Sequence, residues 1–576
     1  MGADRHDVGR VVFSWHPQGD LLASAGRNSI VQVTDRHGDI VDEIQMQSPA
    51  AVTALAWDKD GDYLAILQEG SGVVPLWSSS TRRVIMLESS LKDPTFLAWS
   101  KMGPQLAIGT QKGNLLIYNK TKKQKVPIIG KHAKRITCGC WSTGSNKLTL
   151  GSDDRTLTIS NDAGDTLIHT ELKYAPRETN FTCTKKNNNE DDMVSANLGG
   201  KSLLLFNVQD ENEDPIELTF AAAASGGGCK YGDLIRHEWC EEGSLMIGFT
   251  DVWLIVISTN PKDIGDEKYS SKLHRSLVSF SYNKALHRVA SAGGDGVKIL
   301  DSKDFKEIRG DYISGEDLED GRVTDVRWSP DGQILTVCTA AGNLYNFLAK
   351  MSALNASYKN NIAYLSSLRE VSVVDASRRG KPIDVTLRLE PSIIALGDKH
   401  VAAGMNNFVY YHRIEPKNNP MSSTEREYVG TVQAVCLNDK FAAVMADNKV
   451  VLHTIEPPEG EEQKLSKTFP SREEGSFSVI TCIALSDDFL IYGTEAGSVE
   501  IFFLQEWVLL AGAELRLDAS IVRLQPNADG TRIVVMDASN TVFLFNPVTG
   551  GGVNQSITRF EDAPSNVSSV VWDQAE

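Results

Sequence analysis

The sequence predicts an all-β protein made of two tandem β-propellers, and three observations support this fold. Tryptophan recurs every 42 residues near the start of the chain, as Trp15, Trp57, Trp99 and Trp141. Around each tryptophan the same pattern returns: an apolar strand, a tight turn and a second apolar strand. The 576 residues have room for about fourteen such units. A period of 40–45 residues with four short strands is typical of WD40-type blades, which close into rings.

Each repeat predicts its elements in a fixed order. An apolar strand ends at the tryptophan, and a turn follows, as in HPQG at 16–19, DKDG at 58–61 and SPDG at 329–332. Proline, aspartate and glycine in these turns supply a fixed φ, side-chain hydrogen bonds and a positive φ. A second strand, a hairpin and a third strand come next, as in KGNLLIYN at 112–119 and AGNLYNF at 341–347.

The first half of the chain predicts a seven-bladed propeller over residues 1–314. Three anchors beyond the regular tryptophans continue the count, namely Cys183, which lies 42 residues after Trp141, and then Trp239 and Tyr282. The acidic stretch GEDLEDG at 315–321 lacks apolar periodicity and is the expected junction between the two domains.

The second half, residues 315–576, predicts another WD40-like propeller that opens with the anchor Trp328. Its repeats are more degenerate, but they keep the strand and turn pattern. VSSVVW at 567–572 starts one more inner strand, after which the chain stops. We therefore expect a propeller of seven-bladed type that is incomplete at the C-terminus.

Charge and hydropathy exclude several classes of protein. The net charge of −17 and pI near 5.2 argue against nucleic acid, which binds through clustered lysine and arginine. The apolar runs are strand-length, so no transmembrane segment is expected, and the first residues lack the apolar segment of a signal peptide. The eight cysteines lie mostly in apolar strands and indicate buried, reduced thiols.

The anchor tryptophans Trp15, Trp57, Trp99, Trp141 and Trp328 are expected to be structural. An exposed aromatic surface is the alternative, but their regular place at the end of an inner strand favours packing between blades. The hairpin aspartates Asp153 and Asp295, together with His132, resemble groups that brace WD40 blades by hydrogen bonds.

One basic run stands out in this acidic chain. KTKKQKVPIIGKHAKR at 120–135 contains no acidic residue. Its charged residues are Lys120, Lys122, Lys123, Lys125, Lys131, Lys134 and Arg135. One interpretation is docking of an acidic partner segment or an anionic lipid headgroup. The other is a solvated outer strand and loop between the third and fourth blades.

No metal or cofactor site is expected. DKDGD at 58–62 resembles half of a calcium loop, but Gly61 interrupts the ligand series and the segment fits a turn. Cys229, His237 and Cys240 lack the paired spacing of a zinc site. SGGGCKYG at 225–232 lacks the phosphate-binding spacing and reads as a loop.

An enzyme is not expected either. The sequence contains neither a G-x-S-x-G nor an H-E-x-x-H motif. Valine, alanine, leucine, threonine and cysteine dominate the predicted inner strands, where a propeller enzyme would place paired carboxylates or histidine. Together these patterns favour a protein that holds partners together.

Five segments carry a more specific resemblance: AWDKDGDYLAI at 56–66, GTQKGNLLIYN at 109–119, GKHAKRITCGCW at 130–141, NIAYLSSLREV at 361–371 and GMNNFVYYHRI at 404–414. In register over most of the chain, the sequence resembles the intraflagellar transport protein 144 family, also called WD-repeat protein 19. It departs from the family at the N-terminus, which lacks a leading apolar strand, and in inserts at 185–192 and 221–228.

The resemblance implies a non-enzymatic scaffold subunit of intraflagellar transport complex A. Family members support retrograde ciliary transport and ciliary import of membrane cargo. The implied partners are other complex A subunits, a tubby-like cargo adaptor and membrane-protein cargo, near a membrane surface. The implied location is the cilium or flagellum, the basal body and the cytoplasm. A vesicle-coat type cargo receptor with tandem propellers is the alternative.

Overall fold

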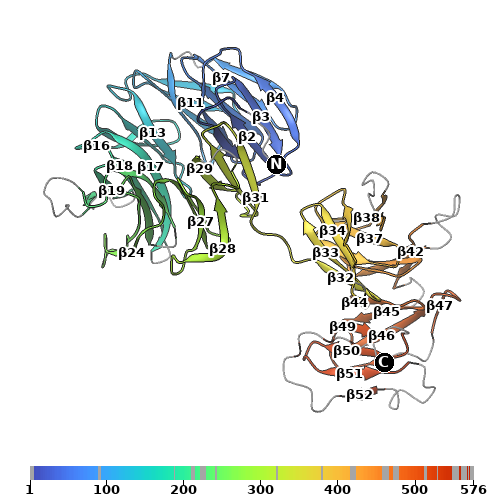
Figure 1. The fold of residues 1–576 in the computed structure, drawn as a ribbon. Helices are drawn as coiled ribbons and strands as arrows, with labels where there is room; N and C mark the ends of the chain where they lie inside the picture. The colour runs from blue at the N-terminus through green and yellow to red at the C-terminus, as the bar shows by residue number, and fades with distance from the viewer. Residues whose placement is uncertain are drawn as a thin grey trace. The chain divides into compact units, whose positions relative to one another are not determined.

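The protein is built from β-strands in two units. The computed structural model describes residues 6–572, except 89–91, 187–188, 209–213, 221–228, 241–242, 319–321, 378–379, 416–422, 457–465, 471–478, 511–514, 528–529, 548–556, 560–566, 568–569 and 571. All regular structure in these residues is strand, so no helix there is long and apolar enough to cross a membrane. Contacts divide the chain into Met1–Lys350 and Met351–Glu576 (Figure 1). The predicted all-β tandem architecture is confirmed.

The first unit has eight antiparallel sheets among its described residues, seven with four strands and one with three. Sheet by sheet, the strands are β1–β4 (Val12–Trp15, Leu21–Ala25, Ile30–Asp35, Ile40–Gln45), β5–β8 (Val52–Trp57, Tyr63–Gln68, Val73–Ser78, Val84–Glu88), β9–β12 (Pro94–Trp99, Gln105–Thr110, Leu115–Asn119, Gln124–Ile128), β13–β16 (Ile136–Trp141, Leu148–Ser152, Thr156–Ser160, Thr166–Glu171), β17–β20 (Pro176–Lys186, Asn189–Leu198, Ser202–Asn207, Ile216–Thr219), β21–β24 (Leu234–Trp239, Ser244–Phe249, Trp253–Ser258, Glu267–Lys272), β25–β28 (Leu277–Asn283, Arg288–Gly293, Gly296–Asp301, Glu307–Ser314) and β29–β31 (Val323–Trp328, Ile334–Thr339, Leu344–Leu348).

The eighth sheet packs against the first and closes the ring. Trp15 Nε1 donates to Thr336 Oγ1 at 3.0 Å, and Gly9 N donates to Ala340 O at 2.9 Å. Arg36 forms an ion pair with Asp331 at 2.9 Å. Figure 1 accordingly draws β29 and β31 beside β2.

The predicted domain boundary after residue 314 is therefore wrong, and so is the predicted count of seven blades for the first propeller. Seven sheets precede that residue, as the repeats indicate, but β29–β31 also belongs to the first unit, which extends to Lys350. Trp328 looked like the start of a second ring because its sequence repeats the anchor pattern. The local sequence pattern does not reveal that the sheet of Trp328 packs against residues more than 300 positions earlier in the chain.

The second unit has five antiparallel sheets among its described residues. Sheet by sheet, the strands are β32–β35 (Asn355–Tyr358, Asn361–Ser367, Glu370–Asp375, Ile383–Thr386), β36–β39 (Ile393–Leu396, His400–Met405, Phe408–Arg413, Thr424–Glu427), β40–β43 (Val432–Leu437, Phe441–Ala446, Lys449–Thr454, Ser466–Phe469), β44–β48 (Ile480–Leu485, Phe489–Thr494, Ser498–Phe503, Val508–Leu509, Leu515–Arg516) and β49–β52 (Ile521–Pro526, Ile533–Asp537, Val542–Phe545, Ile557–Arg559). The strand expected at 567–572 is only partly described, but Trp572 Nε1 donates to Gln525 O at 2.9 Å.

Each seam between neighbouring sheets is filled by apolar side chains from both. Trp57 packs with Trp77 and with Val31 and Val33 of the preceding sheet. Its Nε1 donates to Ser14 O of that sheet at 3.0 Å. Trp141 and Trp328 repeat this bond, to Ala98 O at 2.9 Å and to Ser281 O at 3.1 Å. The anchors thus lie between blades, where they join each sheet to the one before it.

A repeated irregularity identifies the anchor of the fifth sheet. The pairing register between the first and second strands of a sheet shifts just before Ala54, Arg236 and Asp325. Each of these three residues lies three positions before the anchor tryptophan of its sheet. In β17 the same shift comes before Glu178. The anchor position is therefore Phe181, which packs in the seam, and not Cys183 as the 42-residue step predicts.

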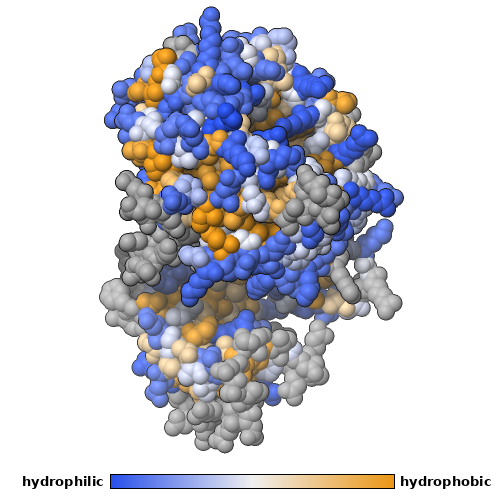
Figure 2. Space-filling model, turned by 90° about the vertical axis from the view of Figure 1, so that its left-hand side faces the viewer, coloured by the Kyte–Doolittle hydropathy of each residue, from blue (hydrophilic) through white to orange (hydrophobic). Residues whose placement is uncertain are grey.

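Figure 2 shows one side of the molecule, where hydrophilic side chains dominate and apolar ones gather in separate patches. Most large apolar residues of the repeats are instead buried in the seams. A blade has two apolar faces, so the ring of neighbours is what covers both of them.

The anchor at Trp99 gives a test of this packing. Trp99 is 5% exposed, so Trp99→Ala is expected to lower the free energy of unfolding by about 3–5 kcal/mol. Chemical denaturation followed by tryptophan fluorescence or circular dichroism measures this loss. An unchanged midpoint would show that the side chain does not hold the seam.

Phenylalanine variants separate apolar packing from the hydrogen bond. Trp99 Nε1 is buried without a partner in the described part of the chain, whereas Trp141 Nε1 is bonded to Ala98 O. Trp141→Phe should therefore cost about 1 kcal/mol more than Trp99→Phe.

Candidate functional site

The basic run extends along the outer edge of the third sheet. Residues 120–123 form the turn between β11 and β12, residues 124–128 form β12, and residues 129–135 lead into β13. Five residues of strand span about 17 Å. Lys122 and Lys123 therefore lie at one end of the strand, and Lys134 and Arg135 lie beyond the other. The run is an outer strand with its two connections, and its charges do not converge on one place.

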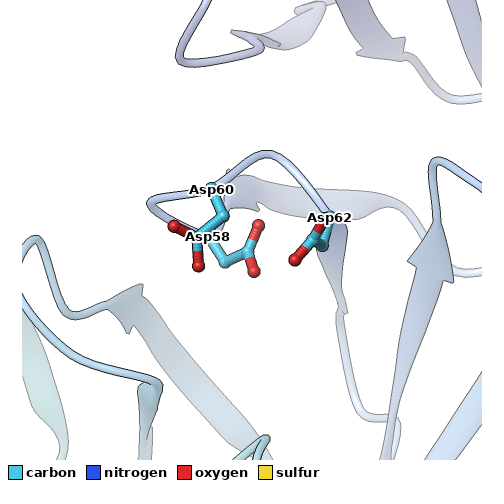
Figure 3. Close-up of side chains that lie close together, drawn as sticks. All are labelled: Asp58, Asp60 and Asp62. Carbon is cyan, nitrogen blue, oxygen red and sulfur yellow. The ribbon is translucent and has the colours of Figure 1, made fainter.

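Lys120 forms ion pairs with three aspartates of the neighbouring sheet. Its Nζ contacts Asp58, lies 3.0 Å from Asp60 Oδ2 and lies 3.4 Å from Asp62 Oδ2. Figure 3 shows the three carboxylates gathered on the turn between β5 and β6. Burial lowers the pKa of Lys120, but hydrogen bonds to Asp58 and Asp60 outweigh burial and raise the pKa overall. The cluster joins the second sheet to the third.

The same three aspartates are the one described group that has the spacing of metal ligands. The sequence interpretation of DKDGD as a turn agrees with its position between β5 and β6. The Lys120 ammonium lies where a cation would be held, so the charge of these carboxylates is already balanced within the chain.

Two further lysines of the run donate hydrogen bonds to neighbouring sheets. Lys125 Nζ donates to Glu88 O of the second sheet at 2.7 Å. Lys131 Nζ donates to Gly164 O at 2.8 Å and to Thr166 Oγ1 at 2.6 Å in the fourth sheet. Burial lowers the pKa of Lys131 to about 8.

The remaining basic side chains of the run are exposed. Those of Lys122, Lys123, Lys134 and Arg135 reach solvent and have no side-chain polar partner among the described residues. They are the part of the predicted site that remains accessible to a partner.

Buried histidines brace three of the blades. His132 lies 2.8 Å from Thr156 Oγ1, 3.0 Å from Thr158 Oγ1 and 3.4 Å from Asp154. Burial lowers the pKa of His132, with Asp154 opposing that shift. The bracing carboxylate is thus Asp154, and the sequence expectation of Asp153, which is exposed, is wrong.

The other two braces repeat this arrangement. His274 lies 2.6 Å from Asp295 Oδ1, so Asp295 does brace its blade, and His6 lies 3.0 Å from Ser24 Oγ. Two of the residues that lack the spacing of a zinc site have separate local partners: Cys229 Sγ accepts from Tyr231 N, and Cys240 Sγ contacts Ser244 O.

Sequence reasoning missed a charged network on the inner strands. Arg236 Nη1 donates to Ser279 Oγ at 3.2 Å, and Ser279 Oγ donates to Asp325 Oδ1 at 2.6 Å. Arg327 Nε donates to Asp325 Oδ2 at 3.2 Å. Burial raises the pKa of Asp325, but Arg327, Ser279 and Arg236 outweigh it and lower the pKa overall.

The expectation that valine, alanine, leucine, threonine and cysteine dominate the inner strands is therefore wrong at two positions in each of the last four sheets of the first unit. The two positions in question lie three residues and one residue before the anchor. In the second sheet they are Ala54 and Ala56. They hold Arg236 and Glu238 in the sixth sheet, where burial raises the pKa of Glu238. Reading these two positions through every repeat would have revealed the charges, although not their pairing.

A serine, an imidazole and a carboxylate also meet between the fifth and sixth sheets. Ser195 Oγ lies 2.9 Å from His237 Nε2, and His237 Nδ1 lies 3.0 Å from Glu178 Oε2. This order is that of a hydrolase triad. However, Ser195 and His237 are both 0% exposed, and Ser195 Oγ also accepts a bond from Trp239 Nε1 at 2.9 Å. With no access for a substrate, the three groups act as an internal brace.

The Lys120 cluster gives a prediction about stability. Lys120→Met leaves three carboxylates facing one another, with Asp58 1% exposed. We expect a loss of about 1–3 kcal/mol in the free energy of unfolding. Urea denaturation measures it, and Lys122→Met on the same turn is the matched control. Equal stabilities of the two variants would contradict the role of Lys120 as a clamp.

Lys131 gives a prediction about pH. Its pKa falls from 10.5 to about 8 on folding, so between these values the unfolded chain binds more protons than the folded protein. The Lys131 contribution to stability should therefore become more favourable as the pH rises from about 8 to 10.5. Denaturation of the unmodified protein and of Lys131→Met across this window measures the difference. Parallel stability curves would count against the shift, and Lys134→Met serves as the exposed control.

Comparison with known proteins relates both units to one family. The model of the WDR19 first beta-propeller matches residues 11–342, and that of the WDR19 second beta-propeller matches 362–576. These limits place β29 and β30 of the eighth sheet in the first propeller, and the contacts place the whole sheet there.

Individual relatives agree with the family models. The chain is 35% identical over 570 residues to human WD repeat-containing protein 19, covering 98% of this chain and 41% of the human protein. It is 29% identical over 538 residues to the Caenorhabditis elegans WD repeat-containing protein dyf-2, of which it covers 38%. The chain thus spans less than half the length of these relatives.

Among solved structures, Saccharomyces cerevisiae Sqt1 matches with a TM-score of 0.50 at 12% identity, covering 61% of this chain and 98% of Sqt1. At that identity the match shows the fold alone. The family models, in contrast, match both units, and the relatives align over nearly the whole chain. The chain therefore belongs to the WD repeat-containing protein 19 family, the family that its sequence resembles.

Proposed function

We propose that this chain is the propeller region of a non-enzymatic scaffold subunit of intraflagellar transport complex A. In this role it supports retrograde ciliary transport and ciliary import of membrane cargo. Family membership over both propellers supports the proposal, as does the resemblance of segments such as GKHAKRITCGCW at 130–141.

The observation that carries a scaffold role is the internal use of polar groups in the first unit. Ser195, His237 and Glu178 brace two sheets, and the serine and histidine are closed to substrates. The Lys120 cluster and the Arg236 network likewise join neighbouring sheets. What such a ring offers to other molecules is a rigid set of turns and outer strands.

The proposed partners follow from this role. They are other subunits of complex A, a tubby-like cargo adaptor and membrane-protein cargo, and the chain works close to a membrane surface. Its proposed location is the cilium or flagellum, the basal body and the cytoplasm. A net charge of −17 disfavours nucleic acid as a partner, and no cofactor is proposed.

A vesicle-coat type cargo receptor is the second candidate. The exposed Lys122 and Lys123 favour it, because a coat receptor reads acidic sorting peptides through basic side chains. Both candidates use the same rigid display and differ in the assembly they join.

Affinity purification of the tagged chain from ciliated cells distinguishes the two candidates. We expect complex A subunits to co-purify and the tagged chain to concentrate in cilia. Trp141→Ala, which disrupts a seam, is the control for dependence on an intact propeller. Co-purification of coat subunits without complex A would replace the proposal with the coat receptor.

We further propose that the exposed turn of the basic run contributes to partner binding through charge. The double variant Lys122→Glu, Lys123→Glu should keep its fold, because exposed substitutions usually change stability by about 0.5 kcal/mol or less. It should bind acidic peptides or anionic vesicles more weakly. Salt should weaken the unmodified protein in the same way, since screening acts over about 8 Å at physiological ionic strength.

The matched control for this prediction reverses two exposed lysines of other sheets, Lys262→Glu and Lys284→Glu. It changes the net charge equally. If both double variants bind alike, or if binding does not respond to salt, the basic run is only a solvated outer strand. Lys125 is left in place because it holds Glu88 O.

A further inference from the structure

The fourth strand of the second sheet, β8, has an apolar outer edge. Val84, Ile85 and Met86 are 36%, 51% and 43% exposed, and they form the one run of three consecutive exposed large apolar side chains among the described residues. β8 bonds to β7 on its inner side, and no described strand pairs with its outer side. An exposed apolar edge of this kind is a template for pairing with another strand.

Other fourth strands of the first unit carry residues that prevent edge pairing. β12 of the next sheet contains Pro127, which has no N–H to donate. β4 of the preceding sheet holds the adjacent acids Asp42 and Glu43, and β24 has lysines near both of its ends. Proline and charge are the usual protection of a sheet edge. From Val84 to Leu87, β8 has neither.

Main-chain hydrogen bonds show which groups of β8 face outward. Arg83 O accepts from the last residue of β7 at 2.9 Å, so the main chain at Arg83 faces β7. Glu88 O accepts from Lys125 Nζ of the third sheet, so the main chain at Glu88 faces away from β7. Successive residues of a strand direct these groups to opposite sides. Val84 and Met86 therefore present their N–H and C=O groups at the outer edge.

The two ends of β8 carry opposite charges. Arg82 and Arg83 lie just before the strand, and Glu88 is its last residue. All three side chains are exposed and form no ion pair within the described part of the chain. Opposite charges across a pair of strands stabilise the pair, and like charges destabilise it. An antiparallel copy of β8 brings the acidic end of each strand to the basic end of the other, so the strand is complementary to itself.

We propose that β8 pairs antiparallel with β8 of a second copy of this chain, with Ile85 opposite Ile85, and so forms a two-fold symmetric dimer. In this register Val84 of each copy lies opposite Met86 of the other, and the outward main-chain groups meet as hydrogen-bonded pairs. Glu88 of each copy lies beside the two arginines of the other. A two-fold interface uses the same surface of both copies and closes, so association stops at two.

An apolar groove on one face of β8 widens this surface. The groove has a volume of about 430 Å³, lies between β4 and β8, and is lined by Val84 and Met86 together with Met46 and Pro75. Opposed residues of antiparallel strands share a face, so Val84 and Met86 of the second copy continue this apolar face. The paired surface is narrow, and we therefore expect weak, reversible association. The inference goes beyond the proposed function and does not depend on which assembly the chain joins.

Sedimentation of the purified chain over a range of about 1–100 μM gives the first test. The mass should rise from 63.0 kDa towards twice that value. Hydrogen exchange of the β8 amides should slow over the same range, while exchange of the β16 amides stays constant. A mass that remains at 63.0 kDa, growth beyond two copies, or β8 exchange that does not depend on concentration would overturn the proposal.

Charge reversal tests the antiparallel register. Glu88→Arg alone, and the double variant Arg82→Glu, Arg83→Glu alone, should each dimerise about ten-fold more weakly, because like charges then face each other. A mixture of the two variants should dimerise again, since opposite charges meet at both ends of the strand pair. The replaced side chains are exposed, so circular dichroism should not change. A mixture that pairs no more tightly than either variant alone would contradict the register and overturn the proposal.

A variant at the centre of the strand tests the apolar edge itself. Ile85→Lys places two like charges opposite each other and should weaken dimerisation by about ten-fold or more. Leu167→Lys is the matched control, since Leu167 is 53% exposed on β16, the fourth strand of another sheet. Dimerisation that survives Ile85→Lys, or that the control weakens equally, would rule out pairing through β8.

Discussion

The seam between neighbouring sheets is the interaction on which the rest of the structure depends. A four-stranded blade has two apolar faces, and one blade alone leaves both in water. The anchor tryptophan covers one of them: Trp57 packs between the first two sheets and donates its Nε1 to Ser14 O. The same bond recurs at Trp141 and Trp328, so it joins the fourth and eighth blades to the blades before them.

A ring built in this way is complete only when the last seam closes. In the first unit the closing contact joins Trp15 to Thr336, which are 321 residues apart. Arg36 and Asp331 add an ion pair across the same seam. Among the described residues, the closing sheet is also the one with three strands.

The same seams account for the charged and polar groups that resemble a catalytic or metal site. Ser195, His237 and Glu178 have the order of a catalytic triad, but the burial of Ser195 and His237 makes the three groups a brace. Lys120 balances the three aspartates of the adjacent turn. The basic run therefore divides into lysines that hold sheets together and residues, such as Lys122 and Lys123, that face solvent. This division fits the proposed scaffold role, in which rigid turns and edges contact other proteins.

The sequence by itself determined the repeat, the all-β class and the positions of most anchors. These features are local, because a strand, its turn and its anchor lie within one 42-residue period. Tertiary structure decided what depends on contacts between distant repeats. It assigned the blade of Trp328 to the first ring, moved the fifth anchor from Cys183 to Phe181 and paired Arg236 with Asp325. Periodicity states which residues are equivalent, but ring closure and ion pairing depend on which blades become neighbours in space.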